Sequence, residues 1–85
     1  MNKKIAVIVT NYNGMKYMPD LFDSLKLTKY PADLWKLVFV DNNSTDESLN
    51  YAKERMPFAK FIENKENLGY TGGNNCGANW AIENN

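Results

Sequence analysis

Apolar residues in this chain come in short runs that end abruptly at polar residues. The run Lys4–Thr10, KIAVIVT, is β-branched and apolar at successive positions, as expected of a central parallel strand buried on both faces. A shorter run, Leu37–Val40, leads directly into Asp41 and predicts a second buried strand. Phe58–Ile62 places Lys60 among apolar residues, a looser pattern that favours an edge strand. The apolar runs therefore predict three strands.

The segments between these predicted strands show the periodicity of helices. After the first strand, apolar residues recur at helical spacing, at Met18, Leu21, Phe22 and Leu25. Pro19 must then lie in or near the first turn of that helix, where its missing N–H does no harm. Ser44 and Glu47 form an S-x-x-E capping box, which predicts a second helix from about Thr45 to Met56.

The end of the chain predicts one more helix. A polar loop, Glu63–Thr71, precedes it, and Gly72 and Gly73 open it, whereas Lys26–Leu34 is expected to be a connector. Strand and helix thus alternate three times, which predicts two parallel crossovers and an α/β fold. We expect a single domain over residues 1–85, and a partial one, because the last helix should lead into a fourth strand.

Composition narrows the classes of function. The 85 residues include 10 basic and 10 acidic side chains, so the formal net charge is zero. This balance argues against nucleic acid or a charged membrane surface as a partner. There is no histidine, which removes the usual general base and zinc ligand, and the single cysteine cannot form an internal disulfide. We expect a cytoplasmic location, with membrane association left open for a longer parent protein.

Right-handed crossovers would bring three polar loops to one rim of the sheet, at the carboxyl ends of the strands. These loops are Thr10–Gly14, Asp41–Asp46 and Asn64–Asn75. Tyr12 offers a ring that could stack on a base, and Asp41 offers an acceptor for an imide N–H such as that of uracil. Together the loops suit a nucleotide, with its base at one end and its phosphates at the other.

Gly72 and Gly73 would let a ligand approach the backbone at a helix N-terminus, where free N–H groups favour phosphate. Each candidate also has a purely structural interpretation. Asp41 would hydrogen-bond the following turn, Tyr12 would pack, and the paired glycines would form a turn before the helix. The G-x-G-x-x-G and G-x-x-x-x-G-K-[ST] motifs are absent, which weakens dinucleotide and P-loop interpretations.

Three blocks of sequence resemble the start of a family 2 glycosyltransferase with the GT-A fold. They read IAVIVTNYNG, VFVDNNSTDES and ENLGYTGGNNCGANWA, in the order and at the spacing of the family. The resemblance covers essentially the whole chain, but only the first half of a typical catalytic domain of this family. It implies a three-layer α/β/α, Rossmann-like sheet with strand order 3-2-1.

The resemblance also implies a binding site for a nucleotide-sugar such as a uridine-diphosphate-sugar. Thr10 and Tyr12 match the positions that embrace the nucleotide base, and Asp41 matches the aspartate that hydrogen-bonds uracil. The loop that borders the nucleotide-sugar is matched by Gly72, Gly73 and Asn74. Members transfer a sugar from a nucleoside-diphosphate donor, with inversion at the anomeric carbon, to a glycan or lipid-linked acceptor, as in cell-wall or polysaccharide biosynthesis.

Two parts of the family's catalytic machinery are missing from this sequence. Full-length members are expected to hold Mg²⁺ or Mn²⁺ through a D-x-D motif, and their catalytic base comes later still; the chain contains no D-x-D. Without the metal the leaving diphosphate loses its main charge stabiliser, and without the base the acceptor hydroxyl is not activated. We therefore expect the isolated chain to be inactive, with no metal site and no catalytic residue.

Two further hypotheses depend on strand order. A flavodoxin-like module, which would bind a nucleotide or protein without catalysis, places the first strand between the second and third. Order 3-2-1 instead makes Lys4–Thr10 an edge and puts the last helix on the opposite face from the first two. Because an open apolar edge recruits another chain, this order predicts self-association through Lys4–Thr10, as a twofold dimer.

Overall fold

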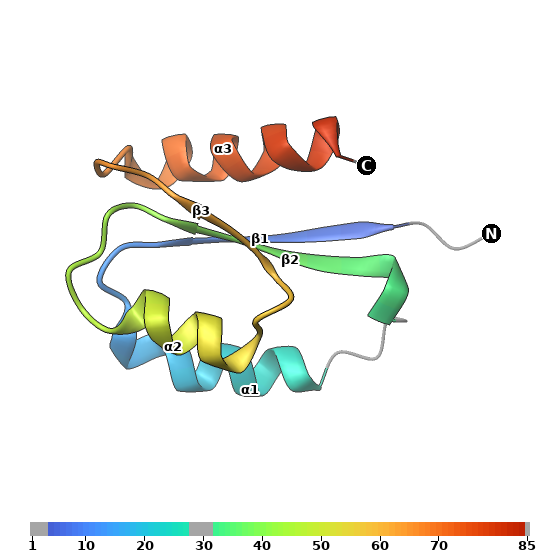
Figure 1. The fold of residues 1–85 in the computed structure, drawn as a ribbon, viewed down its shortest axis with the longest axis horizontal. Helices are drawn as coiled ribbons and strands as arrows, with labels where there is room; N and C mark the ends of the chain where they lie inside the picture. Colours follow the sequence, from blue (N-terminus) through green and yellow to red (C-terminus); the bar gives the residue numbers. More distant parts are fainter. Residues whose placement is uncertain (1–3, 28–31, 85) are drawn as a thin grey trace.

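The chain folds into a parallel sheet with helices on both faces (Figure 1). The computed structural model describes residues 4–27 and 32–84, so residues 28–31 of the predicted connector lie outside the described residues. The strands are β1 (Ile5–Asn11), β2 (Trp35–Asp41) and β3 (Lys60–Glu63). The α-helices are α1 (Met18–Lys26), α2 (Ser48–Arg55) and α3 (Gly69–Glu83), and short 3₁₀ turns are η1 (Met15–Tyr17) and η2 (Ala32–Leu34).

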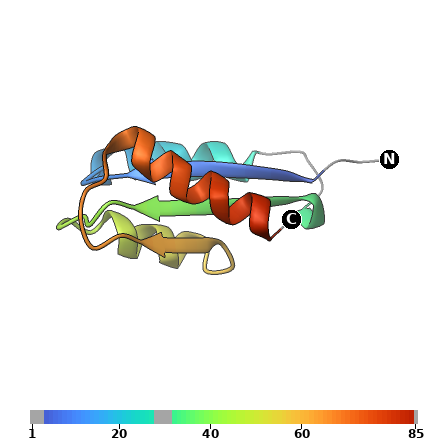
Figure 2. The ribbon, with the colours of Figure 1, turned by 90° about the horizontal axis from the view of Figure 1, so that it is seen from above.

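The order of the strands separates the two fold hypotheses. The sheet has the order β1-β2-β3, which is the predicted 3-2-1 read from the other edge (Figure 2). Both pairings are parallel, as the predicted crossovers require. The flavodoxin-like hypothesis is wrong, because that fold needs β1 in the middle.

The central strand is β2, and it is buried on both faces. Its residues from Leu37 to Asp41 are all buried, whereas β1 is exposed at its start and half-buried over most of its length. The prediction that Lys4–Thr10 forms a central strand is therefore wrong for the described sheet, where β1 lies at one edge. The prediction that the Phe58–Ile62 region supplies an edge strand is confirmed, although β3 begins only at Lys60.

Helices α1 and α2 cover one face of the sheet, and α3 covers the other (Figure 1). The core between the sheet and the first two helices consists of Met18, Phe22, Leu37, Phe39, Ala52 and Met56. The Phe39 ring lies 6.4 Å from that of Phe22 and 5.7 Å from that of Phe61, measured between centroids. Pro19 lies in the first turn of α1, as predicted. This arrangement confirms the three-layer α/β/α fold.

The start of α2 differs from the prediction. The helix begins at Ser48 with Glu47 as its N-cap residue, so the proposed Ser44–Glu47 capping box does not form. The reason is that Ser44 is used elsewhere: its N–H and hydroxyl both donate to Asp41. Asp46 takes over the helix start, since its carboxylate accepts hydrogen bonds from the N–H and hydroxyl of Ser48.

Helix α3 begins at Gly69, three residues before the predicted start, so Gly72 and Gly73 lie inside the helix. Gly73, together with Gly77 one turn later, packs closely against the sheet, whereas a Cβ on Gly72 would meet only Leu68. A Cβ placed on Gly73 would lie 2.3 Å from Thr10 Cγ2, and one on Gly77 would lie 2.6 Å from Ile8 Cγ2. Glycines four residues apart therefore allow α3 to lie directly on β1 and β2.

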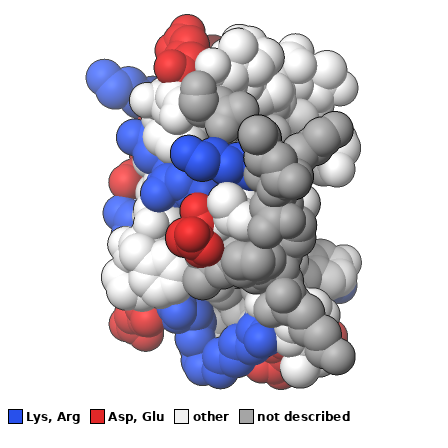
Figure 3. Space-filling view, turned by 90° about the vertical axis from the view of Figure 1, so that its right-hand side faces the viewer, with Lys and Arg blue, Asp and Glu red and all other residues white. Residues whose placement is uncertain are grey.

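At the end of the molecule where β1 and β2 begin, the charged side chains of the described residues are of both signs. Figure 3 shows basic and acidic side chains close together on that face. Among the described residues, none of the helices has both the length and the apolar character that crossing a bilayer requires.

The close seating of α3 leads to a stability prediction for Gly77→Ala. Alanine raises helix propensity by about 1 kcal/mol relative to glycine, but overpacking a tight contact costs about 1–3 kcal/mol. Because the new Cβ would meet the branched side chains of Ile8 and Val40, we expect a net loss of about 1 kcal/mol in the free energy of unfolding.

Urea denaturation followed by circular dichroism would measure this loss. Asn79→Ala is the matched control, because residue 79 is exposed on the same helix and gains propensity without a clash. A Gly77→Ala protein as stable as the control would contradict the proposed contact between α3 and the sheet.

Candidate functional site

The carboxyl ends of the three strands are level with one another. The register aligns Asn11 of β1 with Asp41 of β2, and Asp41 with Glu63 of β3. The pairing continues into the loops, since the N–H of Asn42 donates to the Asn11 carbonyl at 2.8 Å and the N–H of Asn64 donates to the Asp41 carbonyl at 2.9 Å. All three predicted rim loops therefore leave the sheet on the same side, at the carboxyl ends of the strands.

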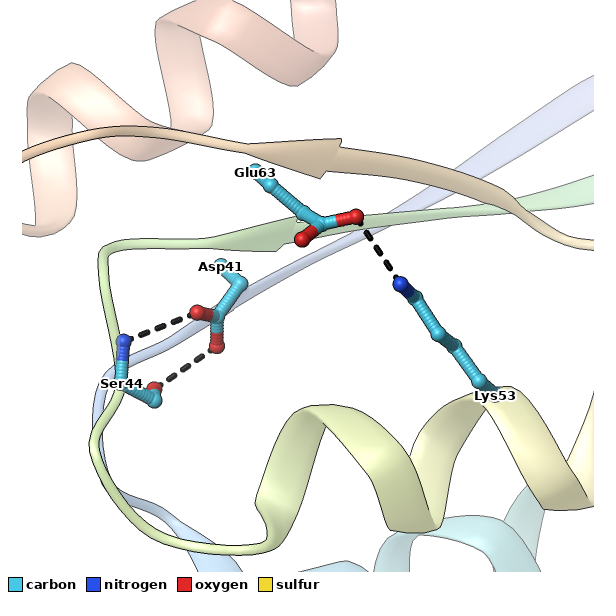
Figure 4. A network of polar contacts seen from close by, with 4 residues as sticks. All are labelled: Asp41, Ser44, Lys53 and Glu63. Atoms are coloured by element: carbon cyan, nitrogen blue, oxygen red, sulfur yellow. Dashed lines mark hydrogen bonds and ion pairs between the residues drawn. The ribbon is translucent and has the colours of Figure 1, made fainter.

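Asp41 is the most enclosed charged group at this edge, with 2% of its surface exposed. Its Oδ1 accepts hydrogen bonds from Asn11 Nδ2 at 2.9 Å and from the Ser44 hydroxyl at 2.7 Å, and its Oδ2 accepts one from the Ser44 N–H at 2.9 Å. Figure 4 shows the two bonds from Ser44. Asp41 thus holds the turn that follows β2, as the structural interpretation of this residue predicts.

Asn11 is a residue of this site that the sequence analysis did not single out. Its side chain is buried, and its Nδ2 lies 2.9 Å from Asp41 Oδ1 and 2.8 Å from the Ser48 hydroxyl. It therefore joins the end of β1 to the end of β2 and to the first turn of α2. The signal in the sequence was its position: Asn11 directly follows the apolar run Lys4–Thr10, as Asp41 follows the run Leu37–Val40.

The first and second loops are fastened together by Asn13. Its backbone has a left-handed φ of 50°, and its Oδ1 accepts a hydrogen bond from the Thr45 N–H at 2.7 Å. In return its N–H donates to the Ser44 hydroxyl at 2.9 Å. Tyr12, between Asn11 and Asn13, is 52% exposed, so its ring projects from a backbone fixed on both sides.

Asp46 makes a second link between these loops. Its Oδ2 accepts a hydrogen bond from the Met15 N–H at 3.0 Å, while its Oδ1 accepts from Ser48. Burial opposes ionisation of this carboxyl, but the hydrogen bonds from Ser48 and Met15 outweigh it and hold the pKa of Asp46 below its ordinary value. Asp46 is therefore a structural anion at neutral pH.

The third loop is joined to the second by a buried amide. Asn42 donates from Nδ2 to the carbonyl of Gly69 at 3.0 Å, and its Oδ1 accepts from Asn64 Nδ2 at 2.9 Å. Nearby, the Thr10 hydroxyl donates to Asn74 Oδ1, which links the end of β1 to α3. The loops after β1, β2 and β3 consequently form one hydrogen-bonded rim.

The predicted site residues can now be placed. Thr10, Gly73 and Asn74 lie together, and Asp41 and Tyr12 belong to the adjoining linked loops. The predicted use of free N–H groups on Gly72 and Gly73 is wrong, because both residues lie past the first turn of α3, where N–H groups bond within the helix.

The carboxylates near this edge do not make a metal site. Asp41 and Asp46 are occupied by protein donors, and Glu63 forms an ion pair with Lys53 at 2.9 Å (Figure 4). Within residues 4–27 and 32–84 there is no group of three histidine, cysteine, aspartate or glutamate side chains that could hold an ion. The described residues thus do not fit the Mg²⁺ or Mn²⁺ expected for the full-length family.

Curated relatives of the chain are glycosyltransferases. Over 51 residues it is 37% identical to the poly(ribitol-phosphate) beta-N-acetylglucosaminyltransferase TarS of two Staphylococcus aureus strains, Mu50 and MW2. The aligned segment is 60% of this chain and 9% of each relative, so the match spans only a small part of those proteins.

Solved structures share the fold. The chain superimposes on the mannosyltransferase PcManGT from Pyrobaculum calidifontis with a TM-score of 0.85, at 22% identity, over 94% of this chain and 25% of that one. It superimposes on residues 1–349 of S. aureus TarS with a TM-score of 0.74, at 30% identity, over 96% of this chain and 24% of that one. Both neighbours are GT-A glycosyltransferases, which confirms the predicted fold.

The resemblance noted in the three sequence blocks is confirmed by the family comparison. The family model for glycosyl transferase family 2 matches residues 6–83, which include all of β1 except Ile5, the linked rim and the whole of α3. The chain therefore belongs to glycosyl transferase family 2.

Proposed function

We propose that this chain is the part of an inverting glycosyltransferase that binds the nucleoside-diphosphate-sugar donor. One observation carries the proposal: the loops after all three parallel strands gather at the carboxyl ends of the strands and are hydrogen-bonded to one another. In parallel α/β sheets this edge is where ligands bind. Family membership gives the class of ligand, and the PcManGT neighbour is described in complex with GDP-Man and Mn²⁺.

The base of the nucleotide is assigned to the loops after β1 and β2. Tyr12 presents an exposed ring on an anchored backbone, which suits stacking on a base. Asp41 Oδ1 already accepts two hydrogen bonds, but Oδ2 accepts one and can accept another, such as that of an imide N–H. Because Asp41 is buried, the base reaches Oδ2 only when the turn after β2 shifts.

The diphosphate and sugar are assigned to the side of the rim formed by α3. Gly73 lets the start of this helix lie on Thr10, and the bond between Thr10 and Asn74 fixes it there. The positive end of the helix dipole then borders the rim, where it favours a phosphate group. Gly72, Gly73 and Asn74 are proposed to border the donor through this placement, not through free N–H groups of the glycines.

Transfer itself requires groups that lie outside these residues. Both oxygens of Asp46 accept hydrogen bonds from the protein, Asp41 is buried, and the chain has no histidine that could serve as a base. The proposed role is therefore to bind and orient the donor for a longer parent protein. That protein would transfer a sugar to a glycan or lipid-linked acceptor; TarS is named as a poly(ribitol-phosphate) beta-N-acetylglucosaminyltransferase and PcManGT as a mannosyltransferase.

Stacking by Tyr12 can be tested by titrating the chain with uridine diphosphate. Removing one base–aromatic stack typically costs about 1–3 kcal/mol, so Tyr12→Ala should weaken binding at least about fivefold. Tyr17→Ala is the control, because Tyr17 is also exposed but lies on η1. Equal affinities of the two variants for uridine diphosphate, measured by calorimetry or by NMR shifts, would show that Tyr12 does not stack on the base.

A second titration tests whether the Asp41 carboxylate accepts a hydrogen bond from the base. A carboxylate acceptor favours uridine diphosphate over cytidine diphosphate, because uracil has an imide N–H where cytosine has an unprotonated nitrogen. Asp41→Asn should abolish this preference, with a loss of about tenfold in affinity for uridine diphosphate and little change for cytidine diphosphate.

If Asp41→Asn weakens both nucleotides equally, Asp41 acts only by holding the turn after β2. Ser44→Ala provides the comparison, since it removes the hydroxyl that bonds Asp41 without changing the carboxylate.

The isolated chain is expected to transfer no sugar. Incubation with labelled nucleotide-sugars, Mn²⁺ or Mg²⁺ and glycan acceptors should release label at the rate of the buffer blank, because the charge stabiliser and the base are missing. Turnover clearly above the blank would show that the chain carries catalytic groups of its own.

A further inference from the structure

The amide of Asn11 donates hydrogen bonds toward two carboxylates. Its Nδ2 lies 2.9 Å from Asp41 Oδ1 and 2.8 Å from the hydroxyl of Ser48, and that hydroxyl donates in turn to Asp46 Oδ1. The hydroxyl of Ser44 is farther from the same nitrogen, at 3.2 Å. Because an amide nitrogen carries two hydrogens, the two shorter bonds use both of them. Asn11 is thus a double donor at the centre of the rim.

The orientation of this amide follows from the chemistry of its neighbours. If it were rotated by half a turn, its oxygen would face Asp41 Oδ1, and two acceptors would meet with no hydrogen between them. A buried carboxylate opposes that arrangement, because it must be matched by donors. Gly14 packs against the other end of the amide, since a Cβ on Gly14 would lie 2.4 Å from Asn11 Oδ1. The nitrogen is therefore held toward Asp41.

The donors to Asp41 come from two different kinds of structure. Ser44 belongs to the turn after β2, and it supplies both the N–H to Oδ2 and the hydroxyl to Oδ1 (Figure 4). Asn11 belongs to β1, where the register of the sheet aligns it with Asp41. A base that reaches Oδ2 must shift the turn, and the bonds from Ser44 shift with it. The bond from Asn11 does not depend on the turn, so it can persist.

We propose that Asn11 is a positioning residue for recognition of the nucleotide base: it holds Oδ1 of Asp41 while the base replaces Ser44 at Oδ2. This role rests on the proposed function, in which Asp41 accepts a hydrogen bond from the base. The last torsion angle of an aspartate side chain has broad minima, so Oδ2 stays in place only if a donor holds Oδ1. Once the turn has shifted, Asn11 is the donor that remains.

The affinities of two variants for uridine and cytidine diphosphate test this role. Asn11→Ala and Ser44→Ala are a matched pair, because each removes one side-chain bond to Asp41 Oδ1. The wild-type chain should prefer uridine diphosphate about tenfold. Ser44→Ala should keep this preference, whereas Asn11→Ala should reduce it to about twofold or less. A merely structural Asn11 would weaken both nucleotides alike and leave their ratio unchanged.

Failure of this role can be told apart from failure of the proposed function. A folded Asn11→Ala protein with the wild-type ratio of affinities, or a Ser44→Ala protein that loses the ratio as completely, would overturn the role of Asn11 and leave donor binding intact. Equal binding of the two nucleotides by the wild-type chain would do the same. A wild-type chain that binds neither nucleotide would overturn the proposed function together with the role of Asn11.

NMR of the wild-type chain provides a measurement that needs no variant. On saturation with uridine diphosphate, the backbone amide of Ser44 should change its chemical shift, because its bond to Asp41 Oδ2 is replaced. The side-chain amide hydrogens of Asn11 should stay slow to exchange with water and keep their nuclear Overhauser contact with Ser48. Rapid exchange of the Asn11 side chain in the saturated sample, or an unchanged Ser44 amide, would overturn the proposal.

Discussion

The burial of the Asp41 carboxylate is the constraint on which the rim of this domain depends. A carboxylate with 2% of its surface exposed must be matched by hydrogen-bond donors, since an unmatched buried charge is prohibitively costly. The donors come from Asn11 on the neighbouring strand and Ser44 in the following turn. Satisfying this one charge therefore fixes β1, β2 and the second loop relative to one another, and Ser44 becomes unavailable as a helix cap.

The other side of the rim depends on backbone rather than on charge. Gly73 and Gly77 allow α3 to approach β1 and β2 more closely than side chains would permit. That approach brings Asn74 within reach of the Thr10 hydroxyl, and Asn42 within reach of the Gly69 carbonyl. Two different physical causes, a buried anion and a close helix–sheet contact, thus produce one continuous edge of polar groups in a family 2 glycosyltransferase domain.

The features that could be predicted from the sequence are those with a strong local signal. The apolar runs located the strands, and the order of strands and helices gave the parallel sheet. The helix starts were misplaced because Ser44 and Gly72 have local patterns that agree with a start, while the bond of Ser44 to the buried Asp41 and the start of α3 at Gly69 are set by the folded chain. Asn11 and Asn42 were missed for the same reason, since a buried asparagine network has no periodicity.

The position of β2 has a consequence for how the domain folds. This strand is enclosed on both faces by helices and on both sides by other strands, and its residues Val38, Phe39 and Val40 have no exposed surface. Neither β-α-β half can bury it alone, because each half leaves one flank of β2 in water. Partly folded species are thereby penalised, and the domain is expected to unfold in a single all-or-none transition, with the two crossover units gaining or losing structure together.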